Sequence, residues 1–279
     1  MRIIKTAQIR DAVKELAIKA NINLRKDVLD ALKRSIVLEK DKNARDRLRL
    51  IIENADIARR ESMPICQDTG MAAVFCELGE DIKIPKDIKK VIAEGIRAGY
   101  KEGYLRKSVV SDPLLRKNTN TNTPPVIHFD IVKGDRMRLT VLPKGFGSEN
   151  ASRLFMLRPT DGEEEIVDYV LETVKDKGAD ACPPLVLGIG IGGTIDTVPI
   201  LATKAILRRI GSRNKNRHVG ALEKRILKRV NSTGIGPAGL GGKVTCIGVN
   251  ILTYATHIAG LPLCVKVSCH ATRSATKTI

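Results

Sequence analysis

The sequence predicts a mixed α/β fold in which a helical N-terminal segment is followed by interleaved strands and helices. Three observations lead to this prediction. Apolar residues recur at helical spacing through the first 60 positions, short apolar runs then alternate with amphipathic stretches, and 43% of all residues are hydrophobic. No linker, low-complexity segment or internal repeat interrupts the 279 residues, so we expect residues 1–279 to form a single domain whose residues 1–60 are helical.

Each expected element follows from its own pattern. Periodic apolar positions predict helices over residues 9–20, 28–36, 48–55, 86–100, 162–177, 199–210 and 218–231. Apolar runs predict strands over residues 71–75, 185–191, 244–252 and 263–267. Two further runs, 126–132 and 136–142, are joined by Lys133-Gly134-Asp135, which predicts a hairpin. Residues 112–125 follow neither period and are expected to be a loop that hydrogen-bonds its own backbone or a ligand.

The chain is strongly basic, with 48 Lys and Arg against 31 Asp and Glu and a net charge of +17. Such a balance is typical of nucleic-acid-binding proteins. Here the basic residues are interleaved with acids and apolar positions, and only 3% of residues are aromatic, so we expect no nucleic-acid partner. The charge then forms a solvated surface, attracts anionic substrates or faces an acidic partner subunit. No apolar run of about 18 residues occurs, which predicts a soluble, cytoplasmic protein with no membrane span.

The six cysteines contain no CxxC pair and therefore no zinc-finger or thioredoxin signature. Three of them lie in apolar, strand-like surroundings, where cysteine behaves as a small buried hydrophobe: Cys76, Cys246 and Cys264. The other three lie beside Pro, polar residues or His at the ends of apolar runs: Cys66, Cys182 and Cys269. Loops are where functional sites are usually built, so the second set contains the candidates for chemistry.

Three glycine-containing segments each allow a structural and a ligand-binding interpretation. Residues 188–194 and 234–243 either allow tight backbone packing or bind an anion, and neither matches a dinucleotide or P-loop pattern. Residues 143–150 form either a strand-ending turn or a nest of backbone donors for a carboxylate. Among the histidines, His257 and His270 flank the last two cysteines and are better placed for acid–base work than His128 or His218.

Five motifs, in this order, resemble the class I fumarate hydratases. They are Pro64-Ile65-Cys66-Gln67-Asp68-Thr69-Gly70, Lys117-Asn118-Thr119-Asn120, Lys144-Gly145-Phe146-Gly147-Ser148, Ala181-Cys182-Pro183-Pro184 and Cys269-His270-Ala271-Thr272-Arg273. The likeness runs from about residue 5 to the C-terminus. It is greatest to the separate alpha subunit of the two-subunit fumarate hydratase and L(+)-tartrate dehydratase family. Phe146 and Glu149 stand where single-chain relatives tend to have a glycine and a small residue, which bears on substrate fit.

The resemblance implies an oxygen-sensitive 4Fe-4S cluster held by Cys66, Cys182 and Cys269. Three thiolates leave one of the four irons without a protein ligand, so that iron acts as a Lewis acid on the hydroxyl and carboxylate of a 2-hydroxy acid. By the same resemblance, Gln67 hydrogen-bonds a substrate carboxylate and Asp68 orients the substrate hydroxyl.

Further substrate contacts are implied by the resemblance alone. Arg106 matches an arginine that binds a substrate carboxylate, for which a guanidinium is a natural bidentate partner. Gly145 and Gly147 offer backbone N–H donors to the substrate. His257 matches an active-site histidine.

The resemblance therefore implies the alpha subunit of an iron–sulfur hydro-lyase that reversibly hydrates fumarate to malate. The alternative is the L(+)-tartrate dehydratase alpha subunit, which gives oxaloacetate, and a remote alternative is a basic nucleic-acid-binding protein. Single-chain relatives continue into a second domain with further substrate-binding residues and the proposed catalytic base. We expect a beta subunit to supply that domain for a small dicarboxylate substrate. An isolated chain should expose an apolar patch through which two copies can pair as a homodimer.

Overall fold

The computed structural model describes residues 1–84 and 87–279. These residues form two compact units, each described by itself. Unit 1 comprises Met1–Arg25, Ala55–Phe146 and Arg273–Ile279, and unit 2 comprises Lys26–Asn54 and Gly147–Thr272. The predicted mixed α/β class is confirmed, because each unit holds a four-stranded mixed sheet with helices packed on it.

The three helices predicted for the N-terminal segment are present as α1 (Thr6–Ile22), α2 (Lys26–Leu38) and α3 (Lys42–Arg60). Helix α1 belongs to unit 1 and buries the stripe that predicted it, including Ile9, Val13 and Leu16. It packs against α4 (Ile88–Glu102) so closely that a Cβ on Gly95 would lie 2.7 Å from the Arg10 carbonyl oxygen. The expected start of α4 at Lys86 falls outside the described residues.

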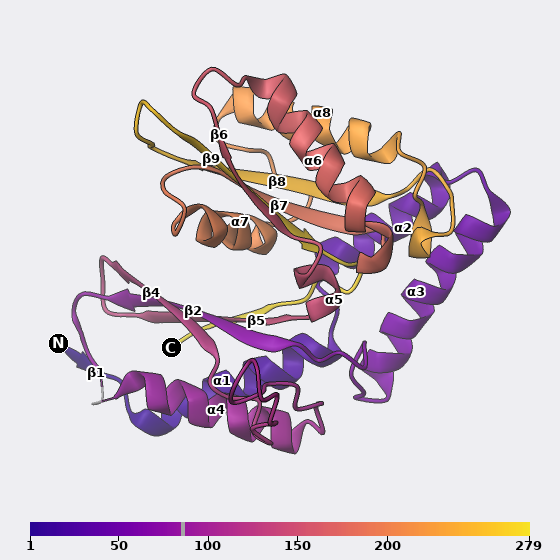
Figure 1. The fold of residues 1–279 in the computed structure, drawn as a ribbon. Coiled ribbons are helices and arrows are strands. Elements are labelled where there is room, and N and C mark those ends of the chain that lie inside the picture. The colour runs from indigo at the N-terminus through magenta and orange to yellow at the C-terminus, as the bar shows by residue number, and fades with distance from the viewer. Residues whose placement is uncertain (85–86) are drawn as a thin grey trace. The chain divides into compact units, whose positions relative to one another are not determined.

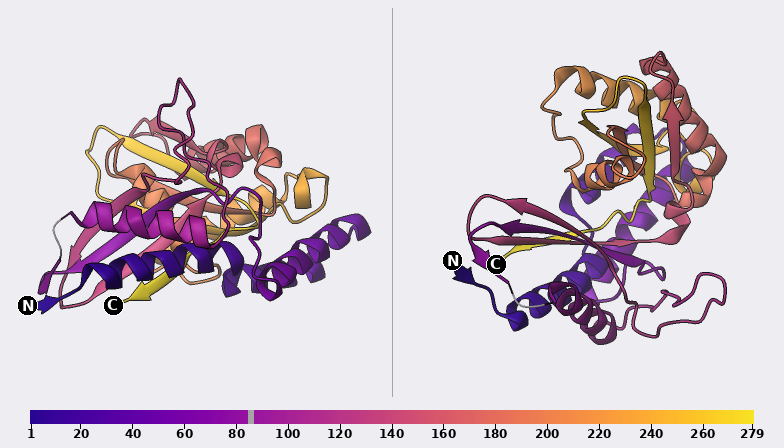
Figure 2. Two further views of the ribbon diagram at one scale, coloured as in Figure 1. Left: turned by 90° about the horizontal axis from the view of Figure 1, so that it is seen from below. Right: turned by 60° about the vertical axis from the view of Figure 1, so that its left-hand side comes forward.

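The sheet of unit 1 has the strand order β10-β5-β2-β4. Its strands are β2 (Met71–Gly79), β4 (Val126–Val132), β5 (Met137–Lys144) and β10 (Ala275–Thr278), and a separate short parallel pair joins β1 (Arg2–Ile3) to β3 (Ile82–Lys83). Helices α1 and α4 lie on the same face of the four-stranded sheet (Figure 2). The core between them contains Ile92, Ile96 and Leu139.

The predicted hairpin of 126–132 and 136–142 is wrong, although both strands exist. Strand β2 lies between them, parallel to β4 and antiparallel to β5. Buried Ala72, Val74 and Cys76 of β2 face the helical core, which makes β2 the natural central strand. Strand β4 is largely half-exposed and lies at the edge of the sheet, where it pairs with β2 alone.

The sheet of unit 2 has the strand order β6-β9-β7-β8. Its elements are α5 (Phe146–Glu149), which begins at the last residue of unit 1, β6 (Arg153–Leu157), α6 (Glu163–Lys177), β7 (Leu185–Gly192), α7 (Val198–Leu207), α8 (Arg217–Asn231), β8 (Cys246–Tyr254) and β9 (Leu261–Ser268). Two 3-10 turns, Ala179–Ala181 and Pro237–Gly239, complete it. Helices α6 and α8 share one core with the sheet, whereas α7 packs on Cys264 at the opposite face (Figure 1).

The two sheets repeat one pairing pattern. In unit 1, β4 and β2 are parallel and β5 and β10 follow antiparallel, while in unit 2, β8 and β7 are parallel and β9 and β6 follow antiparallel. In each unit the central strand, β2 or β7, is joined to its parallel neighbour, β4 or β8, by a segment that contains at least one helix. Strand β7 is therefore the counterpart of β2, and β9 is the counterpart of β5.

The glycines of β7 serve packing. A Cβ on Gly188 would lie 2.3 Å from the Ala202 carbonyl oxygen, and one on Gly190 would lie 2.4 Å from the Val198 carbonyl oxygen. Only glycine lets α7 approach the strand this closely. In the segment 234–243, Gly236 similarly abuts the Gly241 carbonyl, with φ of +69°. The geometry of both segments thus supports the interpretation that their glycines allow tight backbone packing.

Among the residues that the structure describes, no helix is both long enough and apolar enough to cross a membrane.

Candidate functional site

In unit 1, Asp68 lies where the loop before β2 meets the end of β5. Its Oδ1 accepts a hydrogen bond of 3.0 Å from the Gly70 N–H, and its Oδ2 accepts one of 2.8 Å from the Phe146 N–H. Gly70 has φ of +75°, and its Cβ position would collide with the backbone of Lys144 at 2.7 Å. The Asp68 carboxyl group therefore ties the loop that contains Cys66 to the loop after β5.

The glycine at position 145 leaves room for this contact. A Cβ there would lie 3.1 Å from Asp68 Oδ2 and 4.0 Å from Arg273 Nη2. Arg106 joins the same group through its backbone, because its carbonyl oxygen accepts the Thr69 hydroxyl at 2.8 Å. The structure thus brings together three of the predicted residues in unit 1: Asp68, Arg106 and Gly145.

Gln67 is exposed next to Cys66, which is half-buried. The Cys66 thiol is 3.5 Å from Gln67 Oε1 in a hydrogen bond between neighbouring side chains. Both lie in the loop that leads into β2, as the sequence predicts.

The Asn- and Thr-rich loop of residues 112–125 hydrogen-bonds protein backbone. Asn122 is fully buried, accepts the Ser108 N–H at 2.7 Å and donates to the Gly70 carbonyl at 3.1 Å. Asn118 donates to the Lys107 carbonyl at 2.9 Å. These amides fix the segment that carries Arg106 against the turn that carries Asp68.

Tyr100 is the buried side chain that hydrogen-bonds the turn after Asp68. Its side chain is fully buried on α4, and its hydroxyl donates to the carbonyl oxygens of Thr69 at 2.7 Å and Gly70 at 3.0 Å. Burial raises the pKa of Tyr100 to about 12, while the positive charge of Arg273 acts in the opposite direction. Tyr100 therefore stays protonated and holds the turn after Asp68 in place.

Arg273 was missed as a site residue by sequence reasoning. Its side chain is 4% exposed, and its Nη2 donates to the backbone carbonyl of Asp68. Its Nε and Nη1 have no hydrogen-bond partner in the described part of the chain. An arginine this deeply buried is unusual, and it carries unmet donors next to the Asp68 carboxyl group. The only sequence signal was its place in the last motif, four residues after Cys269.

In unit 2, Cys182 and Cys269 lie at one end of the sheet. Cys182 precedes β7, Cys269 follows β9, and these antiparallel strands pair Val186 with Ser268. The His270 N–H donates to the Cys182 carbonyl at 3.3 Å, and His270 Nδ1 lies 2.9 Å from the same oxygen. Cys182 is exposed and has φ of +53°, which is uncommon for a residue other than glycine. Gly147, in α5, is close to the segment before Cys182, since its Cβ position lies 3.9 Å from the Asp180 carbonyl.

His257 lies at the opposite end of the same sheet. It is exposed in the loop between β8 and β9, where its Nδ1 accepts the Ala259 N–H at 3.1 Å. That loop is tied to the far end of β7, because the Thr256 hydroxyl donates to the Gly193 carbonyl at 2.9 Å. The eight residues of β9 separate it from Cys269, a span of about 26 Å. Unit 2 therefore does not bring His257 together with either of its loop cysteines.

The other three cysteines lie inside strands and are buried. Burial raises the pKa of the Cys76 and Cys246 thiols to about 12 and that of Cys264 to about 11. Thiols that hold their protons this strongly are poor metal ligands, because a metal binds the thiolate. The prediction that these three are packing residues agrees with their burial.

The described residues contain no group of three or more His, Cys, Asp or Glu side chains arranged around a metal ion. Cys66 belongs to unit 1, whereas Cys182 and Cys269 belong to unit 2, and each unit is a body by itself. The donor set nevertheless suits an iron–sulfur cluster, since three accessible or half-buried thiols stand in loops beside strand ends while the remaining thiols are buried.

Comparison with known proteins identifies the class as hydro-lyases. The family model described as fumarate hydratase (Fumerase) matches residues 10–278. A putative L(+)-tartrate dehydratase subunit alpha from Methanocaldococcus jannaschii is 42% identical over 279 residues, which covers 98% of each chain. The L(+)-tartrate dehydratase subunit alpha of Escherichia coli strain K12 is 30% identical over 253 residues, covering 90% of this chain and 84% of the relative. The chain belongs to the fumarate hydratase (Fumerase) family.

Proposed function

We propose that this chain is the alpha subunit of a hydro-lyase that acts on a 2-hydroxydicarboxylate, with L(+)-tartrate as the first candidate substrate. Both relatives described above are named for L(+)-tartrate dehydratase, which supports the alternative of the sequence analysis better than its main prediction. The description of the family model keeps malate and fumarate as the second candidate pair.

The observation that carries the proposal is the equivalent placement of the motifs in the two units. Cys66 precedes β2 and Cys182 precedes β7, which are counterparts in the repeated pairing pattern. In the same way, Gly145 follows β5 and Cys269 follows β9. In each unit these residues therefore lie at the end of the sheet where its two parallel strands begin, whereas His257 lies at the other end of unit 2. Loops at strand ends are common places for functional residues.

Cys66, Cys182 and Cys269 are the residues that would hold a 4Fe-4S cluster. When bound, such a cluster supplies a Lewis-acidic iron with no protein ligand of its own. The chain contributes thiolates from three loops, and the His270 N–H bonded to the Cys182 carbonyl fixes the backbone beside two of them.

The roles proposed for unit 1 follow from its hydrogen bonds. Asp68 is held by two backbone N–H groups and orients the substrate hydroxyl, while exposed Arg106 binds a carboxylate. The family resemblance adds backbone N–H donors to the substrate from Gly145 of unit 1 and from Gly147, the first residue after Phe146, in unit 2. Arg273 acts as a positioning residue, because it donates to the backbone of Asp68 from a buried site.

A beta subunit completes the proposed enzyme, and it supplies the base that takes the proton from the carbon next to the hydroxyl-bearing carbon. The alpha-subunit names of the relatives support such a partner. Large exposed apolar side chains in the segment 104–115, which contains Arg106, also support it, since Tyr104 is 93% exposed, Leu114 89% and Leu115 83%. The active-site role predicted for His257 depends on groups that do not lie at its own end of the unit 2 sheet. The variant His257→Asn, assayed in the complete enzyme, tests that role.

The direct test is an anaerobic assay of the cluster-reconstituted chain with its beta subunit on L(+)-tartrate and on malate. We expect dehydration of L(+)-tartrate to oxaloacetate by the mixture and none by the alpha chain alone. Turnover of malate alone would move the assignment to the second candidate pair. Turnover by the alpha chain alone would overturn the proposed division of labour.

Arg273→Lys separates positioning from binding, because lysine keeps the charge but loses the planar fork. A positioning role predicts about a tenfold fall in kcat with little change in KM, since the transition-state contact made through Asp68 is weakened. The matched control is Arg138→Lys, an exposed arginine 3.1 Å from Glu77, which should leave both constants unchanged. A rise in KM at constant kcat would instead make Arg273 a carboxylate-binding residue.

A further inference from the structure

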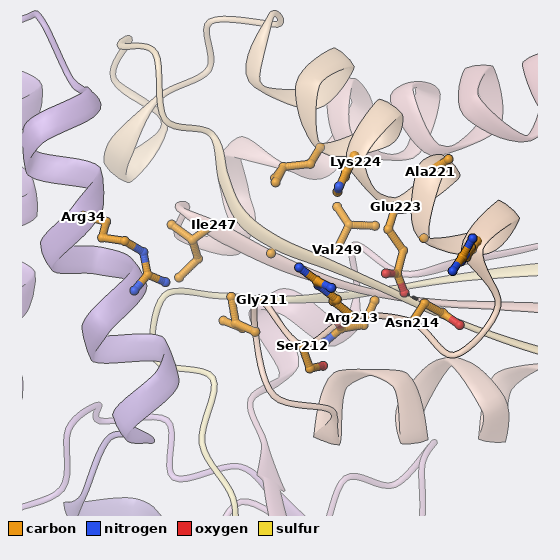
Figure 3. A pocket seen from close by; sticks show the side chains of 16 residues that line it. Arg34, Gly211, Ser212, Arg213, Asn214, Ala221, Glu223, Lys224, Ile247 and Val249 are labelled. Atoms are coloured by element: carbon orange, nitrogen blue, oxygen red, sulfur yellow. Dashed lines mark hydrogen bonds between the residues drawn. The ribbon is translucent and has the colours of Figure 1, made fainter.

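A cavity of about 550 Å³ lies in unit 2 between α2, α8, the loop after α7 and the edge strand β8 (Figure 3). Part of its lining is apolar, formed by Ile210, Leu227, Ile247 and Val249. None of the residues proposed for catalysis, substrate binding or the cluster lines it. Its size is within the range of cavities that hold small organic ligands.

Four cationic side chains line the cavity, from three different elements. Arg34 comes from α2, Arg213 from the loop after α7, and Arg217 and Lys224 from α8. Figure 3 shows Arg34, Arg213 and Lys224 around the cavity. The part of the chain that the structure describes offers none of these four an ion-pair partner.

One acidic residue lines the cavity among the described residues, and its charge is already compensated. Glu223 is 8% exposed, and its Oε1 accepts the Arg208 guanidinium at 2.6 Å, the Asn214 amide at 2.9 Å and the Ile251 N–H at 2.7 Å. The cavity is therefore cationic, because no other carboxylate there offsets the four positive side chains.

Other cations of α8, Arg225 among them, do have ion-pair partners, so the lack of partners is not a general property of this helix. Arg225, on the same helix, bonds Glu163 and Glu164 of α6 at 2.6 Å each. Residues 208–229 nevertheless contain nine Lys and Arg and a single acid, Glu223. The N-terminal turn of α8 also borders the cavity through Arg217 and Gly220, and its helix dipole adds partial positive charge there.

We propose that this cavity binds a nucleoside polyphosphate. Several cations that converge without partners repel one another, and a ligand with several negative charges removes that repulsion. The apolar lining favours an organic group over a purely inorganic anion, since a base or sugar can cover Ile247 and Val249. Charge on the phosphates and an apolar surface on the nucleoside match the two halves of the lining.

The binding test uses the full chain at about 0.15 M salt, where attraction between separated exposed charges is largely screened. Calorimetric titrations compare ATP, inorganic triphosphate and adenosine. We expect saturable binding of one ATP per chain, binding of triphosphate about tenfold weaker, and no binding of adenosine. Equal affinity for ATP and triphosphate would overturn the nucleoside assignment, and absence of saturable ATP binding would overturn the site.

A matched pair of double variants tests the location. Arg213→Ala with Lys224→Ala removes two cations that line the cavity, and should weaken ATP binding about tenfold or more. Arg209→Ala with Lys228→Ala removes the same two charge types from the same loop and helix, outside the lining, and should change affinity by less than about twofold. Equal losses in both would show diffuse attraction and overturn the proposal.

A single variant keeps the test valid if the first pair is unstable. Arg34→Ala lies on an exposed position of a different element, so it should fold normally. It should weaken ATP binding several-fold, and unchanged affinity in this variant would contradict the proposed site.

Discussion

Asp68 and Phe146, 78 positions apart, are joined by a hydrogen bond of 2.8 Å from the Phe146 N–H to Asp68 Oδ2. The same carboxyl group accepts the Gly70 N–H through its other oxygen. The Asp68 side chain, to which the family resemblance assigns a role in substrate binding, therefore also holds two loops together. Its orientation is fixed before any substrate arrives, which is the arrangement expected of a pre-organised site.

Replacing Asp68 by Ala should lower the free energy of unfolding by about 1–3 kcal/mol, because two backbone donors lose a charged acceptor. Urea unfolding measures this. The control is Asp56→Ala, whose exposed ion pair with Arg59 spans 3.5 Å and should contribute less than about 0.5 kcal/mol. Equal effects of the two substitutions would show that the hydrogen bonds of Asp68 between the two loops do not stabilise the protein.

The six thiols should fall into two reactivity classes. In the metal-free chain at pH 8, a thiol reagent should label three thiols quickly, those of Cys66, Cys182 and Cys269, whereas unfolding in denaturant exposes all six. The buried thiols resist labelling because their pKa values are raised to about 11–12. Cluster reconstitution should then protect the three reactive thiols. Rapid labelling of Cys246 in the folded chain would contradict its burial.

Tyr100 should make the protein less stable at high pH. Its pKa is raised from 10.0 to about 12 on folding, so its contribution is complete below pH 10 and is lost as the pH rises toward 12. The expected slope is about 1.4 kcal/mol per pH unit for this one group. Tyr100→Phe removes that slope and, at pH 7, costs about 1 kcal/mol for its hydrogen bonds. Unfolding measured from pH 8 to 11 for both proteins checks this, and identical slopes would refute it.

Gly188→Ala should destabilise the protein by about 2 kcal/mol or more, because the new methyl group would lie 2.3 Å from the Ala202 carbonyl oxygen and α7 would have to move. Gly260→Ala is the control, since its Cβ position meets nothing within 4 Å. Thermal unfolding of the two variants distinguishes them. A stable Gly188→Ala protein would mean that the segment 188–194 is not kept for packing.

Local patterns predicted most elements of the fold. The spacing of Ile9, Val13 and Leu16 is a local property, and it placed α1 correctly. The hairpin failed because the neighbour of β4 is β2, about 50 residues earlier, and no local pattern in β4 and β5 records that insertion. The missed strands β6 and β10 are short edge strands with few buried residues, so their apolar signal is weak.

The candidate site was predictable as motifs but not as geometry. The resemblance named Asp68 and Gly145, whereas their contact depends on pairing between strands far apart in the sequence. Arg273 could not be selected because an arginine is ordinarily exposed and only the packing shows this one buried. The position of His257, at the other end of the sheet from Cys269, follows from strand register, which the residue types do not specify.

The central claim is that Cys66, Cys182 and Cys269 together hold one cluster, and iron content after anaerobic reconstitution tests it most directly. Cys→Ala variants at each of these three positions are compared with Cys→Ala variants at Cys76, Cys246 and Cys264. The account predicts about four irons per chain in the wild type and in the second set, and loss of most of that iron in each member of the first set. Full iron in any variant of the first set, or loss of iron in a folded variant of the second, would contradict it.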